Sequence, residues 1–339
     1  MIEDILDIFL ITYNRAKDLD KTLKKLVESP FSKCQLTILD NCSSDETPQV
    51  CYKYKSIFNN LTVLRHSKNL GAGPNFLRAV ELSKLKYTWV LCDDDLLNFD
   101  NSTDIIKALE LKDYDIICVG SSIKSNWVRG SVSTSKKLMD EYKNYFIIFS
   151  FIPGFIYKTN LYDEKCINQG YQNVNNLFPH FPFINKSFEE NFSVYVSEQE
   201  IIIRGQDNPA GFSGLNWLIG WMNSCLYIEN KTVRKTTVRN IASKTSFTRM
   251  ALSYIALEKM RNDQSPYINI TQFFSSAILV FGLDKNLLIL FFLIPLIILP
   301  KFFYKIFINV YLFFKYTIHN KNPPETIKVN DHIDESRRI

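Results

Sequence analysis

The first 125 residues alternate short apolar runs with segments of helical periodicity, and this alternation restricts the chain to a small group of folds. The apolar runs are 8–11, 36–39, 61–64, 87–92 and 116–119, and the helical segments between them are 18–28, 48–58, 74–84 and 103–111. Each run is short, rich in β-branched or aromatic residues, and apolar on both faces, as in a parallel strand that helices cover on both sides. The pattern predicts a right-handed, doubly wound α/β domain.

Two prolines indicate where helices begin. Thr47 precedes Pro48 and Gly73 precedes Pro74, so we expect Thr47 and Gly73 to cap helices that start at the prolines. Beyond residue 125 the pattern is less regular. It predicts strands at 155–157 and 192–204 and a mostly helical stretch over 210–262.

Composition and charge exclude several classes of protein. With 339 residues, 46% of them hydrophobic and 22% charged, the chain is neither disordered nor collagen-like. Its net charge of +5 is too small to indicate a nucleic-acid partner. The seven cysteines are scattered and form no C-x-x-C pair, which favours free thiols in a reducing compartment over a zinc site or a disulfide framework. The acidic start, residues 1–4, lacks the basic region of a signal peptide, so we expect the body of the protein in the cytosol.

The C-terminal part has a different character. Residues 285–324 contain no Asp or Glu, and lysines alternate there with an apolar run, 287–300, and with aromatic residues at helical spacing over 302–314. The apolar run is shorter than the ~20 residues of a membrane-spanning helix. We expect a basic amphipathic segment that lies in a membrane interface, with a buried hairpin or a dimer interface as the alternative.

Three aspartates, Asp93, Asp94 and Asp95, directly follow the apolar run 87–92. Three like charges at the end of a buried strand repel one another, and a divalent cation resolves this repulsion. Mg²⁺ and Mn²⁺ accept carboxylate and phosphate oxygens together. On an extended chain Asp93 and Asp95 share one side, so this pair is the predicted cation clamp, and a solvated loop is the alternative.

Polar residues follow the other predicted strands as well. They are Thr12, Tyr13, Asn14 and Arg15 after the first strand, Asp40 and Asn41 after the second, and Asn69 and Gly71 after the third. In open α/β sheets, ligands bind beyond the carboxyl ends of the strands. Asp40 or Asn41 is suited to read a base edge, and Asn69 with Gly71 to form a tight turn near a nucleotide.

These segments together resemble the inverting, family-two glycosyltransferases of the GT-A fold. The family's usual signals are an apolar strand followed by T-Y-N, a V-D-D-G-S-x-D segment, N-x-G, and D-x-D or D-D-D after a strand. Here the second signal is residues 39–45, with Asn41 and Cys42 in place of the second Asp and the Gly. Size and tail are similar to the O-antigen and capsule enzymes, including the abequosyltransferase-like branch.

The resemblance implies a mainly parallel, mixed central sheet, flanked by helices and followed by a helical membrane-associating extension. It also implies a nucleotide-sugar donor and a Mn²⁺ or Mg²⁺ cofactor. Asp40 would contact the base, Thr12 would line the nucleotide pocket, Asp93 would touch ribose or metal, and Asp95 would bind the metal. The predicted parts are a donor half 1–125, an acceptor half 126–210, a helical extension 211–284, a membrane-associating segment 285–321 and a disordered tail 322–339.

The family's catalytic base is usually an E-D pair, which this sequence lacks. His180 is the titratable group in the corresponding window, and an imidazole accepts a proton near neutral pH. The alternative is a histidine packed between aromatic rings; Glu189, Glu190 and Asp207 are further candidates. Arg204, after the strand-like run 192–204, is suited to close over a diphosphate, with a plain surface turn as the alternative.

We therefore expect sugar transfer from a nucleotide sugar to a polyprenyl-diphosphate-linked saccharide at the cytoplasmic face of the cell membrane. The protein would be peripheral or monotopic there, held through its C-terminal segment. Two alternatives stay open. A nucleotidyltransferase would favour a Gly-rich phosphate loop, which the first strand lacks. A membrane-bound scaffold of the same fold would have lost its base.

Overall fold

The computed structural model describes residues 1–111, 113–122, 127–141, 148–205, 214–244, 251, 254–255 and 270–281. The chain divides into two compact units. The first comprises Met1–Gln206 and Tyr227–Asn240, and the second comprises Asp207–Leu226 and Ile241–Ile339. The predicted segments 285–321 and 322–339 lie outside the described residues, as does Asp207. The described helices include none long and apolar enough to cross a bilayer.

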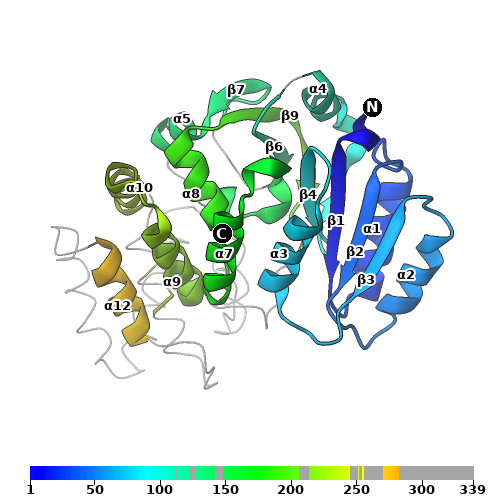
Figure 1. Ribbon diagram of the computed structural model, residues 1–339, viewed down its shortest axis with the longest axis horizontal. Coiled ribbons are helices and arrows are strands. Elements are labelled where there is room, and N and C mark those ends of the chain that lie inside the picture. The colour runs from blue at the N-terminus through cyan, green and yellow to red at the C-terminus, as the bar shows by residue number, and fades with distance from the viewer. Residues whose placement is uncertain are drawn as a thin grey trace, which may run out of the picture. The chain divides into compact units, whose positions relative to one another are not determined.

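A single curled sheet forms the centre of the first unit (Figure 1). Its strands are β1 (Leu6–Thr12), β2 (Gln35–Asp40), β3 (Leu61–Arg65), β4 (Tyr87–Cys92), β5 (Leu96–Leu97), β6 (Ile116–Ser121), β7 (Ser131–Thr134), β8 (Phe155–Lys158) and β9 (Ser193–Ile203). The order is β3-β2-β1-β4-β8-β6-β9-β5, and β7 pairs with β9. β1 to β4 are parallel, and β6 and β9 run in the same direction because β8 is antiparallel to both β4 and β6. The sheet is therefore mixed and mainly parallel.

Helices cover both faces of this sheet. The α-helices of the first unit are α1 (Ala16–Val27), α2 (Thr47–Lys55), α3 (Ala72–Leu82), α4 (Thr103–Leu111), α5 (Ser135–Glu141), α7 (Glu164–Gln172), α8 (Phe181–Glu190) and most of α10 (Lys231–Lys244). Short 3₁₀ turns are η1 (Ile2–Asp4), η2 (Phe99–Asn101), η3 (Ile152–Gly154), η4 (Thr159–Leu161), η5 (Val174–Asn176) and η6 (Cys225–Tyr227). In the second unit, α9 (Gly214–Ser224) packs on α12 (Ile270–Phe281).

The core explains why β1 and β4 are apolar on both faces. All seven residues of β1 are buried, and Ile8 and Leu10 point into one cluster with Leu19 and Leu23 of α1. Apolar side chains of α2 and α4 belong to the same cluster. Helix α3 packs on β1 and β4, and α7 packs on α3. Each fully buried side chain of this kind contributes roughly 1.5–3 kcal/mol of transfer free energy. The double-sided burial holds the carboxyl end of β1 and β4 in place.

The predicted strands and helices of the first 125 residues are confirmed, and two predicted helix starts are wrong. Thr47 is the first residue of α2, after an N-cap at Glu46, and α3 begins at Ala72 after Gly71. Proline is tolerated throughout the first helical turn, so it does not fix the first residue. The Thr47 hydroxyl accepts a hydrogen bond from the Arg15 backbone N–H, and thus joins two loops instead of capping its own helix.

Candidate active site

The carboxyl ends of β1 to β4 meet at one edge of the sheet, because these strands are parallel and adjacent. Thr12 aligns with Asp40, and Asp40 aligns with Arg65. Ile11 of β1 aligns with Cys92, the last residue of β4. The polar segments that the sequence places after the four strands are therefore neighbours in space.

The aspartates 93–95 form a turn between β4 and β5. The sequence prediction placed Asp93 and Asp95 on one side of an extended chain. Residues 93–95 form a turn instead, and side chains do not alternate between two sides in a turn. Asp93 and Asp95 are buried, with 4% and 6% of their surface exposed. The Asp94 side chain is 29% exposed. The threonine hydroxyl of Thr22 on α1 donates to the Asp93 carbonyl at 3.0 Å and fixes the turn to that helix.

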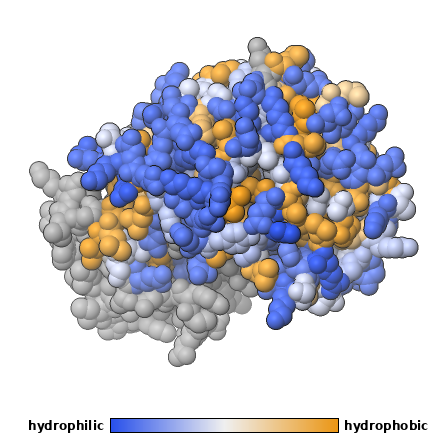
Figure 2. Space-filling model, viewed as in Figure 1, coloured by the Kyte–Doolittle hydropathy of each residue, from blue (hydrophilic) through white to orange (hydrophobic). Residues whose placement is uncertain are grey.

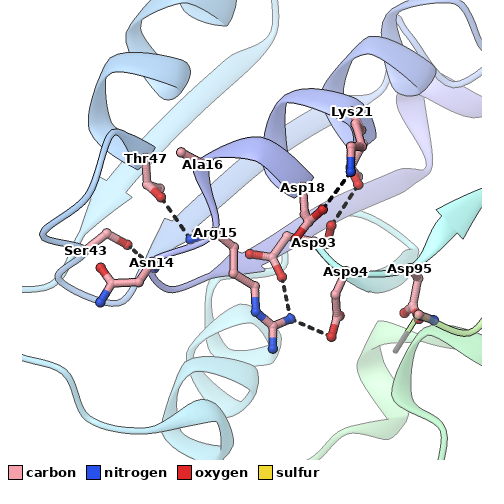
Figure 3. Close-up of polar contacts among 12 residues, drawn as sticks. Asn14, Arg15, Ala16, Asp18, Lys21, Ser43, Thr47, Asp93, Asp94 and Asp95 are labelled. Atoms are coloured by element: carbon pink, nitrogen blue, oxygen red, sulfur yellow. Dashed lines mark hydrogen bonds and ion pairs between the residues drawn. The ribbon is translucent and has the colours of Figure 1, made fainter. Parts of the chain in front are cut away.

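Arg15 neutralises part of this acidic turn (Figure 3). Its Nη1 lies 3.1 Å from Oδ1 of Asp93 and 2.5 Å from Oδ2 of Asp94. These two carboxylates raise the pKa of Arg15 against the opposing effect of burial. The guanidinium is therefore charged in this site at any pH at which the protein is folded.

Asp95 is held from a different side. Its Oδ1 accepts a hydrogen bond from the Gly205 backbone N–H at 2.9 Å. A Cβ on Gly205 would lie 1.8 Å from the carbonyl oxygen of Asp94, so this close approach requires glycine. Burial raises the pKa of Asp95, and the charge of the neighbouring Arg204 opposes this only in part; the Arg204 backbone N–H donates to Ser122 Oγ at 2.9 Å. The segment that the sequence assigned to a closing loop thus contacts the acidic turn.

Burial makes the charged forms of two of these acids costly. It raises the pKa of Asp93 to about 6, although Thr12 and Arg15 act in the opposite direction. It also raises the pKa of Asp95 to about 7, although the Gly205 N–H stabilises the carboxylate. A bound divalent ion would offset this cost of burial and favour the ionised forms of both acids.

The donor set of the turn suits a hard cation. Ligand atoms of Cys92, Asp94 and Asp95 all lie within 4.8 Å of one another. Burial raises the pKa of the Cys92 thiol well above its usual range, so this thiol stays protonated and is a poor ligand. The carboxylate oxygens are the ligands that Mg²⁺ and Mn²⁺ prefer. The residues present therefore fit such an ion.

The loop after β1 is locked to the loop after β2. Asn14 has a φ of 51°, and its backbone N–H donates to Ser43 Oγ at 2.9 Å. The Asn14 Oδ1 accepts from the Ser44 backbone N–H at 2.7 Å. Asp45 accepts from the N–H groups of Ala16 and Thr47, each at 3.0 Å. These bonds set the direction in which Arg15 leaves the backbone.

Asp40 ends β2 in a buried polar position with 1% of its surface exposed. Its Oδ1 accepts from the Ser43 backbone N–H at 2.9 Å, and its Oδ2 lies 3.5 Å from Nε of Arg65. Arg65 also donates to the Ser43 carbonyl at 2.6 Å. Thr12 is likewise buried, at 3% exposure, whereas Tyr13 is 42% exposed.

Asn41 organises the turn after β3. Its Nδ2 donates to Asn69 Oδ1 at 2.7 Å and to the Gly71 carbonyl at 3.1 Å. Its Oδ1 accepts from the Leu70 N–H at 3.0 Å. Gly71 has a φ of 90°, a conformation that favours glycine, and it caps α3. The predicted tight turn with Asn69 and Gly71 is present.

His180 lies in the aromatic core and is fully buried. Its Nε2–H donates to the Phe149 carbonyl at 2.9 Å, and its ring packs against Phe76, Phe178 and Phe181. Burial lowers the pKa of His180 to about 4. These contacts favour the alternative of a packed structural histidine, and its role as base stays a prediction.

The two glutamate candidates lie at the end of α8. Glu189 accepts a hydrogen bond from the Asn230 backbone N–H at 2.6 Å, and Glu190 is exposed. Glu189 therefore fastens the start of α10 to α8. Within the described part of the chain neither glutamate contacts the acidic turn, so their roles as bases also stay predictions.

Several residues of this edge were not predicted from the sequence. They are Thr22, Ser43, Asp45, Arg65, Asn75 and Gly205. Asn75 Nδ2 donates to the Leu39 carbonyl at 3.0 Å, and Asn75 Oδ1 accepts from His66 Nε2–H at 3.0 Å. Ser43 and Asp45 lie in the family segment 39–45 and Arg65 follows a predicted strand, but the contacts of all six residues with other loops depend on the folded sheet.

The family follows from a comparison of sequences. The sequence profile described as Glycosyl transferase family 2 matches residues 7–192, which include strands β2 to β8 and the acidic turn. The chain belongs to this family. The resemblance found in its motifs is confirmed.

Relatives of known function agree with this. The chain is 29% identical over 169 residues to the poly(ribitol-phosphate) beta-N-acetylglucosaminyltransferase TarS of Staphylococcus aureus, a match that covers 47% of this chain and 28% of TarS. It is 32% identical over 93 residues to the abequosyltransferase RfbV of Salmonella typhimurium, covering 26% of this chain and 28% of RfbV. The matches thus span little more than a quarter of each relative.

Solved structures show the same fold. The structure of TarS residues 1–349 in complex with UDP-GlcNAc superposes with a TM-score of 0.59 at 15% identity and covers 81% of both chains. The mannosyltransferase PcManGT of Pyrobaculum calidifontis, in complex with GDP-Man and Mn²⁺, has a TM-score of 0.51 at 10% identity, with 81% of this chain and 80% of that chain covered. The mixed sheet with flanking helices is that of the GT-A fold.

Proposed function

We propose that this glycosyltransferase moves a sugar from a nucleotide-sugar donor to a lipid-linked saccharide, with inversion and with the help of a divalent cation. The observation that carries the proposal is the buried acidic turn 93–95 at the sheet edge where the loops after β1, β2 and β3 also meet. The structures of TarS with UDP-GlcNAc and of PcManGT with GDP-Man and Mn²⁺ support it by their shared fold.

The donor nucleotide would bind over the ends of β1 to β3. Asp40 and Arg65 offer an acceptor and a donor side by side, which suits the edge of a base. Thr12 lies beside Asp40 in the sheet register and would line the pocket. The Asn41–Asn69–Gly71 turn brings backbone groups close to this edge.

The diphosphate would lie near the acidic turn. Asp94 and Asp95, whose ligand atoms lie within 4.8 Å of each other, would hold a Mn²⁺ or Mg²⁺ ion, and Asp93, the other ligand predicted from the sequence, would lie beside them on Arg15. When bound, such an ion offsets the negative charge that develops on the leaving diphosphate. Arg204, which follows β9 and acts electrostatically on Asp95, is suited to contact the same phosphates.

An acceptor linked to a lipid requires the protein to meet a membrane. Support comes from α10, which contains no acidic residue. Its exposed cations Lys231, Lys235 and Arg239 recur every four residues and so lie along one side of the helix. The opposite side holds Thr237, whose hydroxyl contacts Met139 Sδ at 3.2 Å. Hydrophilic side chains gather over α5, α8 and α10 (Figure 2).

The apolar and basic segment 285–321 adds a second element suited to an anionic lipid surface. Together with the similarity to RfbV, it favours an acceptor in bacterial surface polysaccharide synthesis, as in O-antigen or capsule. Membership of the family leaves the nucleotidyltransferase alternative without support. The scaffold alternative is an outcome of the test below.

The test is donor turnover in full-length protein. We expect one or more members of a panel of UDP- and GDP-sugars to be hydrolysed slowly in Mn²⁺ and not in EDTA. Asp95→Ala should lower this turnover at least about 100-fold, because it removes a ligand of the cation that would offset the negative charge developing on the leaving diphosphate. Asp100→Ala, an exposed aspartate of η2, is the matched control and should retain activity.

The stereochemistry and the scaffold alternative are decided in the same assay. Proton NMR recorded before the released sugar mutarotates should show an anomeric configuration opposite to that of the donor. Full turnover in EDTA, or an unaffected Asp95→Ala variant, would contradict the metal role. A complete lack of turnover and of donor binding across the panel would favour the scaffold.

A further inference from the structure

Arg15 leaves the backbone at a fixed point beside the acidic turn. Its own N–H donates to Thr47 Oγ1 at 3.3 Å, and the next N–H, that of Ala16, donates to Asp45 Oδ2 at 3.0 Å. Arg15 is also the N-cap residue of α1. The loop after β2 therefore holds the main chain, and the side chain extends to Asp93 and Asp94 (Figure 3).

A single nitrogen of this guanidinium serves two carboxylates. Nη1 contacts Asp93 Oδ1 at 3.1 Å and Asp94 Oδ2 at 2.5 Å. The two aspartates differ in environment, because Asp93 is 4% exposed and Asp94 is 29% exposed. Asp93 is further fixed by the hydrogen bond from Thr22 to its carbonyl oxygen. The contact with Asp94 is thus the one that can be given up more easily.

Asp94 also belongs to the group of ligand atoms that suits a cation. Its carboxylate lies within 4.8 Å of a carboxylate oxygen of Asp95. A divalent ion bound between these two acids would therefore lie close to the guanidinium on Asp94. Two positive charges that share one carboxylate repel each other strongly in a partly buried site.

We propose that Arg15 is the internal counter-ion of the acidic turn: it holds Asp93 and Asp94 while no divalent ion is bound, and it releases Asp94 when one binds. The proposal rests on the proposed function, which places a divalent ion at this turn. In this arrangement Arg15 stabilises the turn of three neighbouring acids in the metal-free protein, and it lowers the affinity of the turn for a metal ion. Arg15 is thus a positioning residue for the acids, and it retains Asp93 in both states.

The test measures Mn²⁺ binding from the electron paramagnetic resonance signal of the free ion, in full-length protein without donor. Arg15→Gln should bind Mn²⁺ roughly five- to tenfold more tightly, because the competing charge is gone. It should also melt at a lower temperature than wild type without Mn²⁺, and at nearly the same temperature at saturating Mn²⁺. Arg15→Lys, which keeps a charge but not the planar fork, should fall between the two and serves if Arg15→Gln does not fold.

Two controls separate a shared carboxylate from a general change in charge. Lys21→Gln removes one positive charge from α1 that pairs with Asp18 and not with the acidic turn, and its Mn²⁺ affinity should equal that of wild type. In an Asp94→Asn background, Arg15→Gln should no longer tighten Mn²⁺ binding, because the carboxylate that Arg15 and the ion share is absent.

Unchanged or weaker Mn²⁺ binding by Arg15→Gln would overturn the inference, and so would an equal gain in Lys21→Gln. In both cases wild type still binds Mn²⁺, so the proposed metal role survives. A wild-type protein that does not bind Mn²⁺ at all would instead contradict the metal role in the proposed function, and the inference with it.

Discussion

Cys42 occupies a backbone position that glycine fills in the family pattern. Its φ of 66° lies in the left-handed region, where a Cβ costs roughly 1–2 kcal/mol. The strain is retained in a segment whose neighbours, Asn41 and Ser43, hold the turns after β3 and β1 through hydrogen bonds. The cysteine thus keeps the geometry of the motif without its glycine.

We therefore predict that Cys42→Gly stabilises the protein. The expected gain in the free energy of unfolding is about 0.5–1 kcal/mol, because relief of strain exceeds the added flexibility of the unfolded chain. Urea unfolding checks it, and Cys42→Ala is the control, since it removes the thiol but keeps the Cβ. An equal gain in both variants would show that the sulfur, and not the backbone, limits stability.

Single residues also show the limit of what the sequence could predict. The location of Asp93, Asp94 and Asp95 was predictable, because a buried strand must end where acids begin. Their side-chain directions were not, because the strand gives way to a turn at Asp93. The partnership with Arg15 joins residues 78 positions apart, and no local pattern encodes such a contact.

At the scale of elements, the local periodicity of strands β1 to β4 and helices α1 to α4 was sufficient to predict them. The strand predicted at 155–157 is β8, but its antiparallel position between β4 and β6 was not predicted, because that position depends on the packing of the whole sheet. The two-residue β5 is too short to carry a pattern. Helix α8 was hidden because its first turn, 181–184, is apolar on all sides.

The start of α8 carries a prediction on acid stability. Burial lowers the pKa of His180 to about 4 in the folded protein, from an ordinary value of 6.5. Between pH 6.5 and pH 4 His180 therefore binds a proton in the unfolded chain but not in the folded protein. The stabilising contribution is present above pH 6.5 and is lost as the pH falls toward 4. At pH 5 the loss is about 2 kcal/mol.

His180→Gln should remove this loss, because glutamine keeps an N–H for the Phe149 carbonyl but does not titrate. The measurement is urea unfolding at pH 7.5 and pH 5, with Phe178→Leu as a control that weakens the same core and retains His180. The same pH dependence in wild type and His180→Gln would show that His180 is not the buried titrating group. Normal sugar transfer by His180→Gln would in addition remove it as a candidate base.

At the scale of the whole molecule, the net charge of +5 is small, and its distribution matters more than its sum. The acidic turn concentrates negative charge at one sheet edge, whereas α10 carries exposed cations and no acid. Such a separation lets one protein bind a cation at its site and face an anionic surface elsewhere.

We predict that the full chain binds vesicles containing anionic phospholipid and that α10 contributes to this binding. Each basic side chain near such a surface is worth about 1 kcal/mol, so the variant Lys231→Gln with Lys235→Gln should bind roughly tenfold or more weakly in a flotation assay. Lys21→Gln with Lys53→Gln removes the same charge from α1 and α2 and should bind as wild type does.

Raising the salt concentration should weaken binding of wild type more than that of the α10 variant, because screening acts on the charges that the variant lacks. Equal loss in both double variants would assign binding to net charge alone, and equal binding to neutral vesicles would assign it to apolar contacts.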